Sequence, residues 1–370
     1  MIYFDNAATT YPKPDCVYDA VNKALVEYSF NAGRGAYSAA QKTFRMIEET
    51  RNKVAALINE SGSKVIFTSS ATESLNNIIY GLGLKNNDTV FVSPFEHNAV
   101  IRTLHNLGVN IFIIPFSKDT WELDRTEYIN QVVMKRPKAI ILSQISNVTG
   151  YELPYEEIFS LSKRHDCLNI LDCSQGFGIF PVNKANVDFL IFAGHKSLYS
   201  IFGIAGYINI SNYNLKVYKV GGTGSDSLNL DMPNELPYRY EAGSMNSVAI
   251  YALNKSLTFL AEKDYAKEKI DLTKYLIERL KTIHNIEVYL PKGYVSKGIV
   301  SINVEGFTSD EIGMILAEDY DICVRTGHHC APFISEFLDA VKFNGTVRIS
   351  LGIFNTREQI DKLIAALKEI

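Results

Sequence analysis

The amino-acid sequence predicts an α/β fold, with a largely parallel sheet covered by helices on both faces and a smaller α+β unit after it. Three observations carry this prediction. Short apolar runs alternate with helical patterns between residues 64 and 210, and strands spaced by helices of about ten residues indicate parallel pairing. After residue 247, two long helical patterns precede further strands. The chain has 370 residues, 46% of them hydrophobic, which is enough for two domains. We expect a large domain at 15–255 and a small C-terminal α+β domain made of 1–14 and 256–370.

Seven strand candidates follow one another in the first unit. They lie at 64–69, 89–93, 110–116, 138–146, 168–175, 188–194 and 203–210. Helical patterns between them lie at 71–81, 97–107, 124–134 and 154–165. The seventh candidate follows the sixth with no helix between them, so we expect it to run antiparallel. The stretch 221–247 has no periodicity, and functional loops explain it better than a linker does.

The second unit begins with helical patterns at 248–266 and 268–283. Strand candidates follow in IEVYL, GIVSINV and TVRISLGIFN. Between them, the run Ser309-Asp310-Glu311 is typical of a helix N-terminus, and an amphipathic helix is expected from Thr356.

Composition and charge exclude several classes of protein. The 37 basic and 41 acidic residues leave a net charge of −4, so we expect neither a nucleic-acid nor a membrane partner. No apolar run reaches the roughly 18 residues that a membrane span needs, and the first residues do not resemble a signal peptide. The five cysteines are scattered and odd in number, which argues against a disulfide framework. We expect a cytoplasmic protein with free thiols.

A lysine and an aspartate follow two of the predicted strands. Lys196 comes just after the strand at 188–194, where partial desolvation would lower its pKa and leave an amine able to form a Schiff base. Asp172 ends another apolar strand, and such a carboxylate can hold the pyridine nitrogen of pyridoxal phosphate protonated. A surface lysine and a turn aspartate remain the alternatives.

Two helix starts carry further polar residues. In FTSSATESLNNII, the residues Ser70, Ala71 and Thr72 would present N–H groups and a hydroxyl to a phosphate at the positive end of a helix. Simple N-capping explains the same residues. His97 lies at a strand-to-helix junction, where its ring could stack on a flat cofactor or serve only the helix.

The segment VRTGHHCAPF concentrates reactive side chains in one turn. A cysteine beside imidazolium and guanidinium groups is favoured as the nucleophilic thiolate, which points to Cys330 next to Arg325, His328 and His329. A zinc site that includes Cys323 is an alternative, although adjacent histidines fit the usual ligand spacing poorly. A loop cysteine with no role is the other alternative.

The ordered set of motifs resembles the aminotransferase class V enzymes of the fold-type I pyridoxal-phosphate transferases, and specifically the cysteine desulfurases. The set runs through the whole chain as FDNAAT, ATE, EHNA, SNVTG, LDCSQ, GHK, VGGTGSDS, EAGSMN, VRTGHHCAP and VRISLGIFNT. The compact cysteine turn is similar to that of the branch containing SufS and selenocysteine lyase. The resemblance implies a fold-type I architecture with a mostly parallel seven-stranded sheet.

The resemblance also implies roles for individual residues. Lys196 is similar to the cofactor-bearing lysine, Asp172 to the partner of the ring nitrogen, Gln175 to the residue that bonds the ring oxygen, and His97 to the stacking histidine. The implied phosphate contacts are Ala71, Thr72 and His195, with Ser244 reaching the site of the other subunit of a homodimer. Asn147, Arg325 and Arg348 correspond to groups on the substrate side, and Cys330 to the sulfur-accepting cysteine. No metal is implied.

The activity implied is removal of sulfur from L-cysteine, which gives L-alanine and a persulfide on Cys330 for transfer to an acceptor protein, in iron–sulfur cluster assembly for example. Selenocysteine lyase activity, and an aminotransferase or C–S lyase acting on another amino acid, remain alternatives. Three positions depart from the family pattern: Ala193 replaces a frequent serine, Tyr37 in GRGAY replaces a histidine, and SIFGIAG replaces GPTGIG after the lysine.

Overall fold

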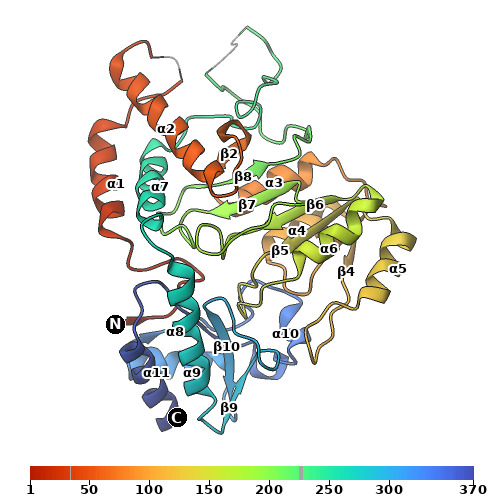
Figure 1. Cartoon of the computed structure of the whole chain (residues 1–370), viewed down its shortest axis with the longest axis vertical. Coiled ribbons are helices and arrows are strands. Elements are labelled where there is room, and N and C mark those ends of the chain that lie inside the picture. The colour runs from red at the N-terminus through yellow and green to blue at the C-terminus, as the bar shows by residue number, and fades with distance from the viewer. Residues whose placement is uncertain (34, 225–227) are drawn as a thin grey trace.

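A seven-stranded sheet forms the centre of the larger part of the molecule (Figure 1). The computed structural model describes residues 1–33, 35–224 and 228–370, so Arg34 of GRGAY and residues 225–227 of VGGTGSDS lie outside the described residues. The strand order is β2-β8-β7-β6-β5-β3-β4. The strands are β2 (Val65–Thr68), β3 (Thr89–Val92), β4 (Asn110–Ile113), β5 (Ala139–Ser143), β6 (Leu168–Asp172), β7 (Phe189–Ala193) and β8 (Ala205–Asn209).

The sheet confirms the predicted topology. Strands β3 to β7 pair in parallel, and β8 runs antiparallel to both β7 and β2. The expected strand at 110–116 is shorter, since β4 ends at Ile113 before Pro115, a residue with no N–H for the ladder.

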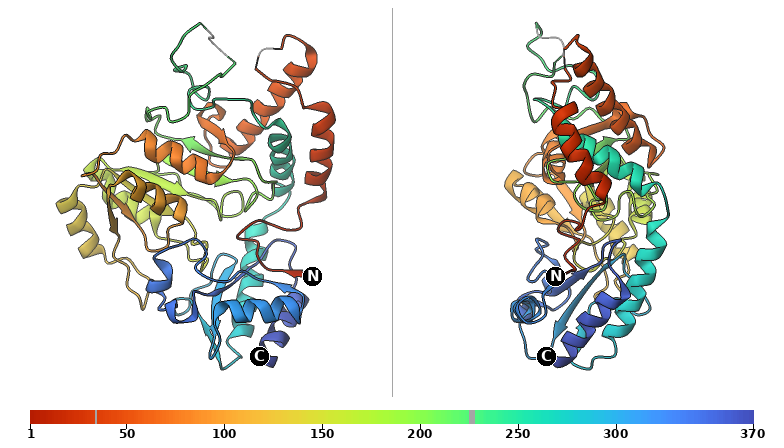
Figure 2. Two further views of the ribbon diagram at one scale, coloured as in Figure 1. Left: turned by 180° about the vertical axis from the view of Figure 1, so that it is seen from behind. Right: turned by 90° about the vertical axis from the view of Figure 1, so that its left-hand side faces the viewer.

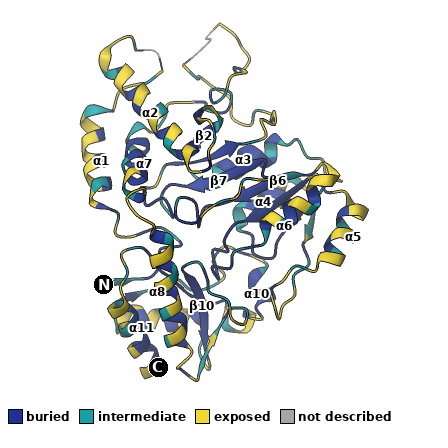
Figure 3. Ribbon diagram, viewed as in Figure 1, coloured by how far each residue is buried: buried dark blue, intermediate teal, exposed yellow. Residues whose placement is uncertain are grey.

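Helices cover both faces of this sheet (Figures 1 and 2). They are α1 (Asp15–Glu27), α2 (Ser38–Ala56), α3 (Ala71–Gly81), α4 (Asn98–Leu107), α5 (Arg125–Lys135), α6 (Tyr155–Ser162) and α7 (Ser247–Leu260), with short 3-10 turns at Gly62–Lys64 and Lys163–His165. Successive residues of one strand enter opposite cores: Ile140 packs in one hydrophobic cluster and Ile141 in another. The central strands are therefore buried on both sides (Figure 3), as a parallel sheet requires.

A second, three-stranded antiparallel sheet lies in the C-terminal part, with the order β12-β10-β9. Its strands are β9 (Ile286–Val288), β10 (Ile299–Val304) and β12 (Val347–Ser350). The helices of this part are α8 (Tyr265–Leu280), α9 (Ser309–Glu318), α10 (Ile334–Phe337) and α11 (Arg357–Glu369), with a 3-10 turn at Val341–Phe343. The chain start joins it, because β1 (Ile2–Tyr3) pairs in parallel with β11 (Ile322–Cys323).

The single helical pattern expected at 248–266 is wrong in extent. Helix α7 ends at Leu260, and a new helix begins at Tyr265 after Asp264, whose side chain accepts the N–H of Ala266. The predicted domain boundary at 255/256 falls inside α7. The division into 15–255 and 1–14 with 256–370 itself stays a prediction. Within the described ranges, no helix is long and apolar enough to cross a membrane.

A buried ion pair fastens the long loop before α7 to the edge of the large sheet. Arg51 of α2 donates to both carboxylate oxygens of Glu241, at 2.7 and 3.0 Å, and to the carbonyl of Val65. Glu241 also accepts the N–H of Phe67 on β2. Because both side chains of the pair are almost fully buried, loss of Glu241 leaves the buried Arg51 charge with only the partly exposed Glu48 as its partner.

We therefore expect Glu241→Ala to lower the free energy of unfolding by about 3–5 kcal/mol, as breaking a buried pair does. Urea unfolding of the cofactor-free protein measures the effect. The matched control is Glu268→Ala, which removes the exposed Lys263–Glu268 pair and should leave the midpoint nearly unchanged. Equal losses from the two substitutions would contradict this role of the buried pair.

Candidate active site

The carboxyl ends of neighbouring parallel strands meet at one cavity of about 260 Å³. Ligands bind at this edge in open α/β sheets. Chain segments that follow β3, β5, β6 and β7 all line the cavity, and the turn after β11 closes it from the C-terminal part. The sequence-predicted residues brought together here are Ala71, Thr72, His97, Asn147, Asp172, Gln175, His195, Lys196, Arg325, Cys330 and Arg348.

One end of the cavity offers neutral hydrogen-bond donors. Ser70 caps α3 by accepting the N–H of Glu73, which leaves the N–H groups of Ala71 and Thr72 without an acceptor among the described residues. Burial and the neighbouring Lys196 charge lower the pKa of His195 to about 3, so its ring is neutral. Free N–H groups at the positive end of a helix fit a phosphate.

The residues around Lys196 fit the remainder of pyridoxal phosphate. Burial lowers the pKa of Lys196, and the nearby Asp172 carboxylate opposes this shift. The Oδ1 atom of Asp172 accepts the N–H and the hydroxyl of Ser174 at 2.9 and 2.5 Å, while Oδ2 has no hydrogen bond within the described residues. A free carboxylate oxygen suits a protonated ring nitrogen. Gln175 uses one amide hydrogen on the carbonyl of Ala7, at 3.1 Å, and keeps a second.

His97 is fixed by its own helix. Its Nδ1 accepts the N–H of Ala99 at 3.0 Å as the N-cap of α4, so the proton of the neutral ring lies on Nε2. Burial and the Lys196 charge lower the pKa of His97 to about 4. The side chain therefore presents a flat, neutral ring with a defined tautomer to the cavity that it lines.

Sequence reasoning missed the buried carboxyl of Glu96, directly before His97. Glu96 accepts the hydroxyl of Ser93 at 2.5 Å and both the N–H and the hydroxyl of Ser143 at 2.9 and 2.8 Å. Burial raises the pKa of Glu96 to about 7. It ties the ends of β3 and β5 together beneath the cavity. Its only sequence signal is its place in the EHNA motif.

The cysteine turn is held in an unusual backbone conformation. His329 and Cys330 both have positive φ, 50° and 57°, a region that side chains other than glycine rarely adopt in succession. Two contacts from the large sheet hold the turn. The N–H of Asn98 donates to the carbonyl of Cys330 at 2.6 Å, and the Asn147 amide donates to the carbonyl of His329 at 2.8 Å. The exposed Cys330 thiol lies 3.8 Å from a guanidinium nitrogen of Arg325.

The expectation that His329 adds positive charge beside Cys330 is wrong. His329 is buried, and its Nε2 lies 3.0 Å from the carbonyl oxygen of Thr346, which can only accept a hydrogen bond. Burial, reinforced by Arg348, lowers the pKa of His329 well below its usual value, so the ring is neutral.

The zinc-site alternative does not fit this geometry either. His328 bonds Ser335 through Nδ1 at 2.7 Å, whereas His329 bonds Thr346. Across residues 1–33, 35–224 and 228–370, no group of three or more His, Cys, Asp or Glu side chains is placed to hold a metal ion.

The two arginines predicted to lie on the substrate side are neighbours across a strand pair. Arg325 and Arg348 form an antiparallel bridge through their backbones. The buried Arg348 guanidinium donates to Asp5 at 2.6 Å and to the carbonyl of Asn147 at 2.9 Å. Asp5 was not predicted as a site residue, because its partner lies 343 residues away in the sequence.

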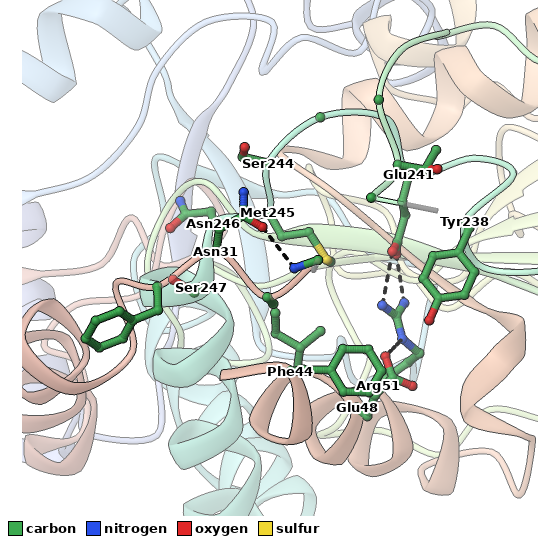
Figure 4. Close-up of a pocket in the computed structure, with 18 of the residues that line it drawn as sticks. Asn31, Phe44, Glu48, Arg51, Tyr238, Glu241, Ser244, Met245, Asn246 and Ser247 are labelled. Carbon is green, nitrogen blue, oxygen red and sulfur yellow. Dashed lines mark hydrogen bonds and ion pairs between the residues drawn. The ribbon is translucent and has the colours of Figure 1, made fainter. Parts of the chain in front are cut away.

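Ser244 does not line this cavity in a single chain. It lines a separate cavity of about 740 Å³ between the connection that joins α1 to α2, helix α2 itself and the loop before α7 (Figure 4). Of the three family departures, Ala193 lines the active-site cavity and supplies no hydroxyl, Tyr37 is exposed and precedes α2, and SIFGIAG lies in the turn between β7 and β8 and the first residues of β8.

Comparisons with known proteins agree with this geometry. The model of the aminotransferase class-V family matches residues 2–363. A probable cysteine desulfurase of Vibrio cholerae is 30% identical over 99% of this chain and 93% of its own length. Another, from Methanothermobacter thermautotrophicus, is 29% identical over 100% and 94%. Among solved structures, a cysteine desulfurase from Thermococcus onnurineus has a TM-score of 0.90 at 28% identity, over 100% of this chain and 94% of that one. The cysteine desulfurase CsdA from Escherichia coli has a TM-score of 0.84 at 25% identity, over 99% and 94%.

The neutral His195 makes a testable contribution to acid stability. The unfolded chain binds a proton on this ring below pH of about 6.5, whereas the folded chain, with a pKa of about 3, does not. Folding stability is therefore lost as pH falls from about 6.5. In the cofactor-free protein, His195→Gln should reduce the slope with which the free energy of unfolding falls between pH 6 and 4, by up to about 1.4 kcal/mol per pH unit.

Urea unfolding of both proteins from pH 4 to 8 measures this difference. Above pH 7 neither state is protonated at His195, so the two curves should run parallel there. Parallel curves down to pH 4 would contradict a neutral, buried His195.

Proposed function

Because the chain belongs to the aminotransferase class-V family, we propose that it is a pyridoxal-phosphate-dependent cysteine desulfurase that takes sulfur from L-cysteine. The family, to which cysteine desulfurases belong, depends on pyridoxal phosphate. One observation carries the proposal beyond the family: an exposed cysteine, Cys330, lines the same cavity as Lys196. A transaminase needs no thiol at that place.

The cofactor would be held by residues of four elements: the starts of α3 and α4, the end of β6 and the turn after β7. The helix start at Ala71 and Thr72 and the ring of His195 take the phosphate. Asp172 takes the ring nitrogen through its free oxygen, and His97 stacks on the ring. When bound, pyridoxal phosphate supplies an electron sink that weakens bonds at the α- and β-carbons of the substrate.

The other residues bind the substrate and move its protons. Arg348, positioned by Asp5, and Arg325 bind the substrate carboxylate together with the amide of Asn147. The lowered pKa of Lys196 makes its neutral amine, the form that can act as a general base, more available than that of an ordinary lysine. His97 keeps a proton on Nε2, where it can be donated within the cavity.

Cys330 accepts the sulfur. Its thiolate forms a bond to the substrate sulfur while the bond between that sulfur and the β-carbon breaks, and the electron pair of the broken bond stays with the carbon fragment. The fragment takes up protons to become L-alanine, and Cys330 is left as a persulfide. A guanidinium nitrogen of Arg325 lies 3.8 Å from the sulfur of Cys330.

Selenocysteine is a second candidate substrate, because the same residues would accept selenium from it. An aminotransferase or C–S lyase acting on another amino acid is the remaining alternative, in which Cys330 is dispensable. The pinned, left-handed turn at Cys330 favours the sulfur-accepting role over this alternative, since strained backbone is retained where a side chain must be aimed.

We further propose a homodimer, a sulfur-acceptor protein as partner, and a cytoplasmic location. The phosphate end of one chain lacks a hydroxyl at Ala193. Ser244 lies on the loop before α7, where it lines the separate cavity (Figure 4) and where a second copy could receive it. All five cysteines are free, which suits a reducing compartment.

Cys330→Ala should abolish the formation of alanine and sulfide from L-cysteine, because no thiolate remains to attack the substrate sulfur. Retained absorbance of the bound cofactor shows that the site is intact. Cys323→Ala, a change in a half-buried cysteine of the neighbouring strand, is the matched control and should keep near-normal turnover. Full turnover by Cys330→Ala would refute the desulfurase proposal and favour the lyase alternative.

Mixed dimers test the shared site. Lys196→Ala chains and Ser244→Ala chains, each inactive alone, should regain about a quarter of wild-type activity after random subunit exchange, since half of the dimers carry one intact composite site. The Ser244→Ala protein must first prove severely impaired. Confirmed exchange without recovery would show that Ser244 does not complete the partner's site.

A further inference from the structure

The turn between β7 and β8 contains the chain's most marked departure from the family pattern, and it places a phenylalanine on a predicted phosphate ligand. The ring of Phe202 stacks on that of His195, with centroids 4.6 Å apart and planes inclined by 28°. Phe202 is nevertheless 63% exposed. A large apolar ring left mostly in solvent gains little from burial, so its contact with His195 needs another explanation.

Among the described residues, no hydrogen bond holds the ring of His195. The backbone carbonyl of His195 is held by four donors: the N–H and the hydroxyl of Thr10, the hydroxyl of Thr9 and the amine of Lys13. Its two ring nitrogens, in contrast, make no hydrogen bond to any described residue. Hydrogen bonds therefore fix the backbone of His195 but not its ring, and the stack on Phe202 is the contact that orients the ring.

The Phe202 backbone is held well enough to restrain that ring. The N–H of Ser200 donates to the carbonyl of Gly194 at 2.8 Å, and the amide of Asn246 donates to the carbonyl of Gly203 at 3.4 Å. Gly203 has φ of 85°, a conformation that admits glycine at no cost. The turn is thus anchored on both sides of Phe202.

We propose that Phe202 is a positioning residue for the cofactor phosphate. By stacking on His195, it fixes the plane of the imidazole ring and so keeps a ring nitrogen directed at the phosphate end of the cavity. This inference rests on the proposed cofactor site but not on the desulfurase reaction. The role has a reason in this chain. Ala193 offers no hydroxyl, so fewer donors remain and the orientation of each matters more.

The affinity of the cofactor-free protein for two ligands tests the proposal. Pyridoxal phosphate and pyridoxal differ only in the phosphate, and spectroscopic titration gives both dissociation constants without reference to turnover. Phe202→Ala should raise the dissociation constant of pyridoxal phosphate roughly three- to tenfold, the range expected for the loss of one aromatic stack. The dissociation constant of pyridoxal should stay within about twofold of the wild-type value, because the residues predicted to bind the ring are unchanged. Phe202→Tyr, which keeps the stack, should restore the wild-type value.

A double-mutant cycle separates positioning from general damage. In a His195→Gln background, Phe202→Ala should cause no further loss, since nothing is left to orient. Tyr218→Ala is the matched control: Tyr218 is 52% exposed and stacks on Tyr80 at 4.9 Å but does not line the cavity, so neither affinity should change.

Three results would overturn the proposal. The first is an equal loss of affinity for both ligands in Phe202→Ala. The second is a loss of affinity for pyridoxal phosphate that persists in the His195→Gln background. The third is no loss of affinity at all. If Phe202 served only as a surface covered by a second copy, size-exclusion chromatography would show a changed oligomeric state with both ligands weakened alike. None of these outcomes would contradict the proposed desulfurase activity. A wild-type protein that binds no pyridoxal phosphate would overturn the proposed function as well.

Discussion

The parallel sheet imposes the constraint on which the site depends. Strands β3, β5, β6 and β7 are buried on both faces and mostly apolar, with Asn169 inside β6 as an exception. Most of their polar residues therefore lie at the ends, and parallel pairing brings the same ends to one edge. Ser143 and Asp172 are direct partners across β5 and β6, and Lys196 follows β7. Glu96 then links β3 to β5. A desolvated lysine beside a carboxylate therefore follows from the packing of the sheet.

The first ten residues connect this edge to the C-terminal part. Asp5 pairs with Arg348, and its backbone bridges Ser350. A few residues on, the carbonyl of Ala7 accepts the Gln175 amide, and the N–H of Thr10 donates to His195. One short segment thus touches the substrate-side arginine and two predicted cofactor ligands. This explains why FDNAAT forms a motif although none of its side chains was predicted to act in the site.

Features with a local cause could be predicted from the sequence, and features that depend on distant contacts could not. Alternation of apolar and helical patterns gave all seven strands of the large sheet, including the reversed β8, because both signals arise within about ten residues. Strand-end residues such as Asp172 were found for the same reason. The charge of His329 was misjudged because its neutrality depends on burial and on Thr346, and the Asp5–Arg348 pair joins opposite ends of the chain. The stack of Phe202 on His195 needs a turn geometry that its letters do not reveal.

The cavity separates two kinds of anion recognition, and this separation bears on which substrates the proposed site admits. Its phosphate end carries neutral donors, the N–H groups of Ala71 and Thr72 and the ring of His195, aided by the dipole of α3. Its other side carries Arg325 and Arg348, and Asp5 balances one of these two charges. With Cys330 as the thiolate that the proposed reaction uses, each substrate carboxylate adds one negative charge to that side, and a second carboxylate on the side chain would add an unbalanced charge in a partly desolvated space. Charge alone thus favours a small amino acid with an uncharged side chain, which is the class to which cysteine belongs.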